Sequence, residues 1–335
     1  MKKLILCWIV IAAASALHAM TYDEFKSEIA AAPDGGTVVL QNDVTYDSAL
    51  PSISKRITIT SPAGMTNTLL RASSYTGKII VVMSNETADI TFTNVAIDGN
   101  KSASRTGRAF EIAGGKLTLD SGAAIRNFDF GYNDGGIHVS INGTIVMNDG
   151  AEISGCDYGR GTHFAMILVG ERSLHLETGV PDGVFEMNGG IITGNAGHSS
   201  QTTPDYDGVI YIYSYEQKNG VIRLNGGLIT GNTSENSCAG VCPGVGKMYL
   251  GGNACITGNV GGVVNDIYRL RGDIYVQDGF CGQATIHLTG GDAPTKLGPR
   301  QKAYRVWRKA VTSLARETSP GRKILNGCCA DTTLL

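Results

Sequence analysis

Charged side chains are scarce in this sequence, since Asp, Glu, Lys and Arg together make up 17% of its 335 residues. That depletion is more typical of a surface of stacked glycine and asparagine turns than of an ordinary enzyme. A long apolar run is also lacking, because Leu4–Ala14 is too short to favour a membrane anchor. Glycine is abundant instead, with 45 residues, and tight turns between strands account for that number without disorder.

The first residues have the pattern of a secretory signal peptide. Lys2 and Lys3 precede the apolar run, and small residues end at Ala16 or Ala19. We therefore predict that residues 1–19 are removed and that the rest is exported. Cys7 lies inside the apolar run without a lipoprotein-type cleavage context, so no lipid anchor is predicted.

One phrase is written three times in the middle of the chain, at Val184–Asn195 (VFEMNGGIITGN), Val221–Asn232 (VIRLNGGLITGN) and Lys247–Asn259 (KMYLGGNACITGN). Looser copies begin at Lys116, Thr144 and Asp273. The first residues of successive copies are 28, 40, 37, 26 and 26 positions apart, as read from these numbers. Repeats of this length indicate a solenoid or another repetitive fold.

Each copy contains two runs of strand length separated by a glycine turn, and a third run precedes it. Three strands and three turns in one repeat make one coil of a parallel β-solenoid, in which each coil pairs with the next about 4.8 Å away. We therefore predict an all-β fold, a parallel β-helix with three strands per coil. The third runs are Gly136–Ile141, Phe164–Val169, Val209–Ser214 and a weakened Gly262–Asn265.

An asparagine recurs at the end of the repeat, at Asn100, Asn195, Asn232 and Asn259. Stacked on successive coils, these amides are expected to hydrogen-bond along the axis as a ladder, although they are also tolerated turn residues. Other residue types occupy this corner in two copies and interrupt the ladder, Phe128 and Cys156.

The repeated NGG and ITGN phrases resemble those of right-handed parallel β-helix proteins of the pectin-lyase-like superfamily. Among these, the chain most resembles the passenger regions of bacterial adhesin-like and polymorphic outer-membrane proteins, whose GGA[ILV] repeats are similar to Gly135-Gly136-Ile137 and Gly261-Gly262-Val263. Ile replaces Phe in the second repeat type of that family, FxxN. The resemblance covers about residues 88–290 and implies a scaffold at the bacterial surface or outer membrane, or secreted from the cell.

Both ends of the predicted solenoid differ from its middle. Thr21 and Glu24 have the spacing of a capping box, so we predict a helix that covers the first coils within residues 20–87, ahead of the regular repeats at 88–292. Residues 293–335 form a basic tail with nine Lys or Arg against Glu317 and Asp331, a net charge of +7. Gln301–Ala315 is predicted to be a short basic helix that caps the other end, binds an anionic surface or belongs to an unrelated tail.

Removal of Cys7 with the signal peptide leaves seven of the eight cysteines, an odd number. Cys238 and Cys242 can close a small disulfide in an oxidising compartment. No second pair of Cys or His stands at ligand spacing, so we expect neither a metal nor a cofactor. The simpler alternative for Cys156, Cys255 and Cys281 is that each packs as a small apolar residue.

The long steps between copies require insertions, at Asp157–His163, Glu171–Asp182 and Gly197–Asp207. An aromatic ring next to charged groups suits a sugar, through stacking and hydrogen bonds. Strand pleating explains the tyrosines equally well. The candidate ligand-binding residues are Asp205, Tyr206, Asp207, His198 and Arg160.

Paired catalytic motifs are missing, because the aspartates are scattered one per turn and none has the Asp-Asp or Asn-x-Asp spacing of the hydrolases in this superfamily. We therefore expect a non-catalytic, adhesin-like scaffold that binds a polysaccharide or a cell-surface partner, and no nucleic acid. The alternative is a polysaccharide lyase or glycoside hydrolase with an atypical site. For that case the residues to test are Asp129, Asp134, Asp157, Arg160 and His163.

Overall fold

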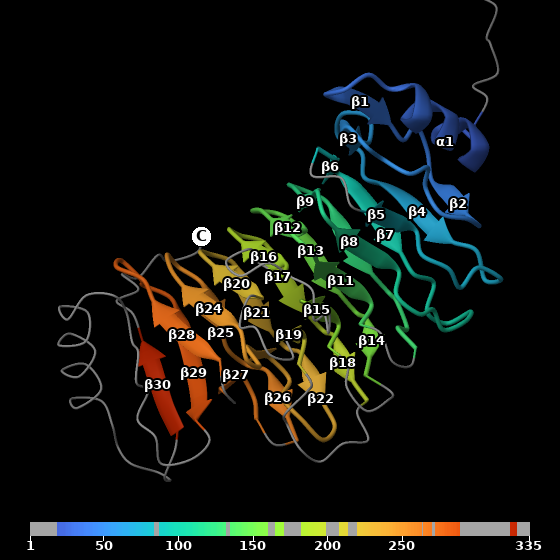
Figure 1. Ribbon diagram of the computed structural model, residues 1–335. Helices are drawn as coiled ribbons and strands as arrows, with labels where there is room; N and C mark the ends of the chain where they lie inside the picture. The colour runs from blue at the N-terminus through green and yellow to red at the C-terminus, as the bar shows by residue number, and fades with distance from the viewer. Residues whose placement is uncertain are drawn as a thin grey trace, which may run out of the picture.

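The chain winds into a stack of coils, with α1 at one end and β28 to β30 at the other (Figure 1). The computed structural model describes residues 19–83, 87–131, 135–159, 165–170, 182–198, 208–213, 220–262, 264–269, 272–288 and 322–326. Within these ranges it contains one α-helix, and that helix is too short and too polar to cross a bilayer. The predicted basic helix at Gln301–Ala315 lies outside the described residues.

The strands fall into three long faces and one short one. Face A is a nine-stranded parallel sheet. It consists of β1 (Gly36–Val39), β3 (Arg56–Thr60), β6 (Asp89–Thr93), β9 (Lys116–Leu119), β12 (Thr144–Met147), β16 (Val184–Met187), β20 (Val221–Leu224), β24 (Lys247–Leu250) and β28 (Asp273–Val276).

Face B follows face A in each coil. It consists of β2 (Val44–Tyr46), β4 (Asn67–Arg71), β7 (Val95–Asp98), β10 (Ala124–Arg126), β13 (Glu152–Ser154), β17 (Ile191–Thr193), β21 (Leu228–Thr230), β25 (Cys255–Ile256) and β29 (Gln283–Leu288).

Face C closes the coil before the next strand of face A. It consists of β5 (Ile80–Met83), β8 (Phe110–Ala113), β11 (Ile137–Ser140), β15 (Ile167–Val169), β19 (Ile210–Ile212), β23 (Val241–Cys242) and β27 (Ile267–Arg269). β29 pairs with β25 of face B and with β27 of face C. β30 (Arg322–Asn326) pairs with β29 in the antiparallel direction.

A short face lies between B and C, made of two-residue strands that the sequence did not predict. They are β14 (Asp157–Tyr158), β18 (Ala196–Gly197), β22 (Thr233–Ser234) and β26 (Val260–Gly261). Runs of two residues show no alternation that a sequence pattern can reveal, so only their pairing in the stack identifies them as strands.

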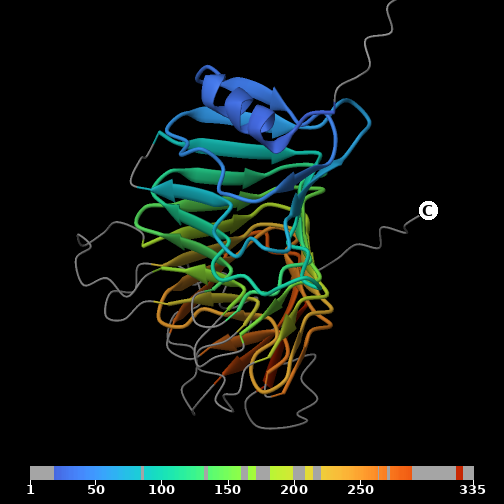
Figure 2. The ribbon, with the colours of Figure 1, turned by 90° about the vertical axis from the view of Figure 1, so that its right-hand side faces the viewer.

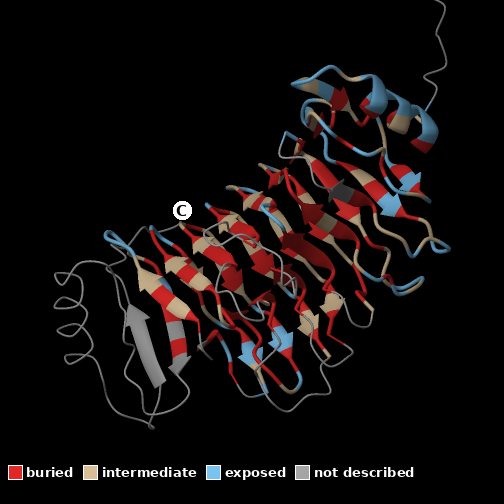
Figure 3. Cartoon of the chain, in the orientation of Figure 1, coloured by how far each residue is buried: buried red, intermediate tan, exposed pale blue. Residues whose placement is uncertain are grey.

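The sequence repeats match the strand register residue by residue. Val184 lies opposite Val221 on face A, and Ile192, Ile229 and Ile256 lie opposite one another on face B. All three isoleucines are buried, as are the other inward side chains that fill the interior of the stack (Figure 3). The parallel β-helix predicted from the sequence is therefore the observed fold, with aliphatic residues stacked in one continuous core.

The predicted third runs are correct in three coils and wrong in one. The described residues of the range Gly262–Asn265 form no strand of face C. That position belongs to β27, while Val264 makes an isolated bridge to Cys238. The equivalent strand one coil earlier is β23, which has only two residues and lies between Gly240 and Pro243. Glycine and proline on either side shorten this strand, so the alternating pattern that identifies a strand in the sequence is lost there.

Helix α1 (Tyr22–Ala31) covers the end of the stack that precedes β1, as Figure 2 shows from the side. The predicted capping box is present: the Glu24 backbone N–H donates to Thr21 Oγ1 (3.3 Å), and the Thr21 N–H donates to Glu24 Oε2 (2.8 Å). The helix buries Tyr22, Phe25 and Ile29 against the first coils. It therefore shields apolar core that the first coil otherwise exposes.

The turn from face B into the short face requires a left-handed backbone. Gly155, Gly194, Gly231 and Gly258 have φ between 61° and 70° there, and Asn127 takes the same place with φ 55°. Glycine adopts this conformation without a steric cost from Cβ, and asparagine tolerates it better than most residues. This requirement explains why the repeat ends in Gly-Asn.

Candidate functional site

The asparagine that closes each repeat points into the core in three successive coils. Asn195 donates from Nδ2 to Asn232 Oδ1 (2.9 Å), and Asn232 donates in the same way to Asn259 Oδ1 (2.9 Å). All three side chains are buried. The Asn232 Nδ2 also donates to the carbonyl of Ile192 (3.0 Å), so this buried amide uses both of its donors.

Asn100 does not join this column. Its own backbone is left-handed (φ 46°), whereas in later coils the preceding Gly or Asn takes that conformation. The turn is thus displaced by one residue, and Asn100 Nδ2 donates to the backbone oxygen of Arg71 (3.0 Å). Phe128 and Cys156 are the buried residues that lie between it and Asn195 along the stack.

Two of the acidic residues proposed for catalysis meet at the corner formed by the short face. Asp129 and Asp157 lie opposite each other in an isolated parallel bridge. His198 follows β18, with Nε2 3.9 Å from Asp157 Oδ2 and Nδ1 2.7 Å from Glu235 Oε1. We call Asp129, Asp157, His198 and Glu235, with the two cations described next, the His198 corner.

The two aspartates of the His198 corner are paired with cations from an earlier turn. Lys101 Nζ lies 3.1 Å from Asp157 Oδ1, and Arg105 Nε lies 3.3 Å from Asp129 Oδ2. The sequence did not point to Lys101, Arg105 or Glu235, because they come from two coils that are far from each other along the chain. The arrangement is a chain of charged contacts along the outside of the stack, in which His198 lies between Asp157 and Glu235.

The other predicted site residues lie outside the described part of the chain. They are Asp134, Arg160, His163, Asp205, Tyr206 and Asp207. Within the described residues no group of three or more His, Cys, Asp or Glu side chains is arranged to hold a metal ion.

Cys238 and Cys242 both lie in a small buried cluster with Tyr211 and Tyr268, on the outer side of face C. The Cys238 sulfur lies 3.9 Å from the backbone oxygen of Asp266. Cys242 belongs to β23, so the segment between the two cysteines runs directly into a strand. The disulfide between them stays a prediction.

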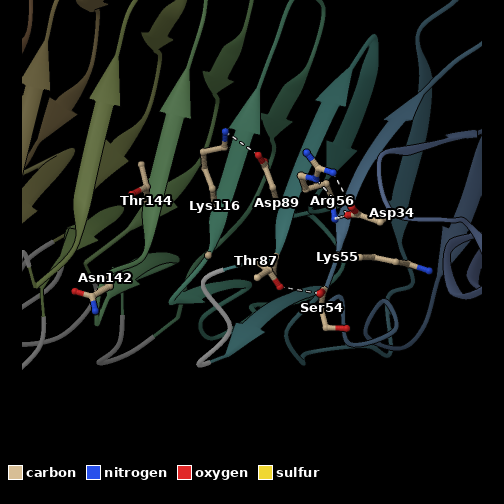
Figure 4. Close-up of a pocket in the computed structure, with 11 residues that line it drawn as sticks. Asp34, Ser54, Lys55, Arg56, Thr87, Asp89, Lys116, Asn142 and Thr144 are labelled. Atoms are coloured by element: carbon tan, nitrogen blue, oxygen red, sulfur yellow. Dashed lines mark hydrogen bonds and ion pairs between the residues drawn. The ribbon is translucent and has the colours of Figure 1, made fainter.

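A groove crosses the first residues of the face A strands next to α1, where Figure 4 shows its side chains. It encloses about 810 Å³. The sequence did not predict it, because its residues come from five successive coils and three of those contribute no clear repeat. Its lining consists of Asp34, Ser54, Lys55, Arg56, Thr87, Ala88, Asp89, Gly115, Lys116, Asn142 and Thr144.

The charged residues of the groove form pairs. Arg56, Asp89 and Lys116 occupy the same position in β3, β6 and β9, so their charges alternate along one column. Lys116 Nζ lies 2.7 Å from Asp89 Oδ2, and Arg56 Nη2 lies 2.6 Å from Asp34 Oδ2. When the strands before Lys116 are aligned with the repeats, this alternation of charge is the one signal of the groove that the sequence contains.

Hydrogen bonds from Arg56 hold the pKa of Asp34 at about 2, below its ordinary value of 3.8. They come from the side chain and from the backbone N–H, which lies 2.9 Å from Asp34 Oδ1. Lys55 is fixed differently, because its Nζ donates to the backbone oxygens of Ala30 (2.9 Å) and Ala32 at the end of α1. A cation at the end of a helix is favourable, and here it ties the helix to the groove.

Comparisons of the chain with protein-family models, with curated proteins and with solved structures find no match. The assignment to the parallel β-helix fold therefore rests on the strands and their register.

Proposed function

We propose that this protein is an exported, non-catalytic β-helix scaffold that acts at the bacterial surface or outside the cell and binds a glycan or a cell-surface partner. The groove beside α1 is the observation that carries the proposal. It has the volume of a ligand site and is lined by hydroxyl, amide, carboxylate and cationic groups. The predicted signal peptide and the resemblance to adhesin-like passenger regions support export and surface location.

The pairing of charges favours binding over catalysis. A general acid or base needs a pKa suited to proton transfer and access to a reacting group. The Asp34 carboxylate is held by Arg56 with a pKa far below neutrality, and the Asp89 carboxylate is in contact with Lys116. Side chains already held by rigid strands lose little freedom when a ligand binds, which favours recognition.

The groove is tested by binding of purified mature protein to arrayed glycans and to whole cells. We expect Lys116→Ala to weaken binding about tenfold, as the loss of a charged hydrogen bond does. Lys247→Ala is the matched control, since Lys247 holds the same strand position four coils away and lies outside the groove. Equal effects of the two variants would argue against the groove as the binding site.

The His198 corner favours a second candidate, a polysaccharide-cleaving enzyme. It places a histidine between two carboxylates at the corner from which the insertions after Gly159 and His198 begin. Release of reducing ends or of unsaturated products from acidic and neutral glycans, with and without calcium, tests it. Activity that disappears in both His198→Gln and Asp157→Asn would replace the non-catalytic proposal.

A further inference from the structure

A second column of polar side chains lies on the outside of the stack, where each face A strand turns toward face B. Asn225 donates from Nδ2 to Asn188 Oδ1 (2.9 Å), and Asn188 donates to Asn148 Oδ1 (3.3 Å). Unlike the buried asparagines, these side chains contact solvent, and Asn188 is exposed. We call Asn148, Asn188, Asn225 and Gln277 the amide column.

Gln277 continues the amide column although a glycine separates it from Asn225. Gly251 takes the intermediate position, and a Cβ there would lie 2.2 Å from Gln277 Oε1 and 3.4 Å from Asn225 Oδ1. The absence of a side chain at Gly251 thus lets the longer Gln277 side chain reach back across one coil. The amide groups therefore extend along the stack from β12 to β28.

The amide column keeps hydrogen-bonding capacity for a ligand. A primary amide has two N–H donors and an oxygen with two acceptor sites. In Asn188 the axial bonds use one donor and one acceptor site, and the exposed side chain leaves the others to solvent. The axial bonds also fix the orientation of the amide, so a ligand need not order it.

We propose that the amide column binds an extended, uncharged polysaccharide whose chain lies along the axis of the stack. The inference rests on the proposed binding function but uses a surface separate from the groove. Hydroxyl groups both donate and accept, as the amides do. Asn148, Asn188 and Asn225 repeat once per coil, about 4.8 Å, which is close to the length of one sugar ring in an extended chain.

Two other ligands fit the amide column less well. An extended peptide presents side chains on one side only every ~6.6 Å, so it falls out of step with the coils within a few residues. An acidic polymer lacks a counter-charge, because the amides are neutral and the preceding residue of the same column is Asp120. The chemistry therefore selects a hydroxyl-rich, uncharged chain.

Affinity electrophoresis of the purified mature protein tests this inference, in native gels that contain hydroxyethylcellulose, galactomannan, dextran or polygalacturonate. We expect at least one neutral polymer to retard the protein. The triple variant Asn148→Ala, Asn188→Ala and Asn225→Ala should require about tenfold more polymer for half-maximal retardation, because several ligand hydrogen bonds are lost. The single variant Asn188→Ala, at an exposed position, should show a smaller shift in the same direction.

Lys116→Ala separates the amide column from the groove. Retardation lost in the triple variant and kept in Lys116→Ala supports the column. Retardation lost only in Lys116→Ala overturns the column inference and leaves the groove proposal standing. Unchanged mobility of the wild type in every neutral gel also overturns the column inference. So does a triple variant that has the melting temperature of the wild type and needs a polymer concentration within about twofold of the wild type's for half-maximal retardation.

Discussion

The Asn259 amide donates to a carboxylate oxygen of Asp266 at 3.0 Å and so ends the buried asparagine column. One N–H of each amide in the column is oriented toward this residue, since Asn195 donates to Asn232 and Asn232 donates to Asn259. Asp266 accepts and is itself buried. A carboxylate suits the last place because it needs no further acceptor beyond it.

Removal of one buried amide should destabilise the stack far more than removal of an exposed one. Asn232→Ala removes a hydrogen-bond partner from Asn195 and from Asn259 and one donor from the Ile192 carbonyl, at a cost of about 3 kcal/mol. The matched control Asn188→Ala, in the exposed amide column, should cost about 0.5 kcal/mol. Denaturant unfolding measures both; similar losses would mean that the buried bonds add little.

The end of the buried column should depend on an acceptor and not on a charge. Asp266→Asn keeps an oxygen for Asn259, so we expect a loss of less than about 1 kcal/mol. Asp266→Leu has a similar size but no acceptor, and it should cost about 2 kcal/mol because a buried N–H is left unsatisfied. Equilibrium unfolding of the two variants side by side decides between an acceptor and mere packing.

The left-handed turn should discriminate between alanine and asparagine at one glycine. Gly231 has φ 64°, a conformation in which a Cβ costs about 1 kcal/mol. Gly231→Ala should therefore lower the free energy of unfolding by about that amount. Gly231→Asn should lower it less, since Asn127 adopts the same conformation at the equivalent turn; an equal or larger loss for asparagine would contradict this account.

Acid should weaken the contact between Asp34 and Arg56 over a defined range of pH. Because folding lowers the pKa of Asp34 from 3.8 to about 2, the ionised group stabilises the folded state above pH 3.8. That contribution declines as the pH falls toward 2 and is lost below it. The melting temperature of Asp34→Asn should thus lie below that of the wild type at pH 5, and the difference should vanish near pH 2.

The Cys156 thiol should be unreactive in the folded protein. Burial raises its pKa to about 12, and the residue has no exposed surface. Iodoacetamide at pH 8 attacks thiolates, so the peptide that contains Cys156 should stay unmodified in native protein and react fully in guanidinium chloride. Rapid native labelling of this peptide, measured by mass spectrometry, would show that the middle coils open far more readily than their packing implies.

Much of the fold was predictable because the repeats carry the register of the stack. Val184 and Val221 aligned in sequence before their pairing was known, and the Thr21 to Glu24 spacing located α1. The site was less predictable. His198 and Asp157 lie 41 positions apart in the sequence, as read from their numbers. Strand pairing brings their coils into contact, as in the 2.8 Å hydrogen bond from the His198 N–H to the Tyr158 oxygen.

The sequence by itself determined which residues point inward, because the aliphatic and asparagine positions recur with each coil and a stack places like residues over like. Only the tertiary structure decided which polar side chains meet outside. Insertions make the coils unequal in length, so the neighbours of Asp89, His198 and Gln277 depend on the strand pairing. Backbone hydrogen bonds between adjacent coils fix which side chains become neighbours, whereas the number of residues between them in the sequence does not.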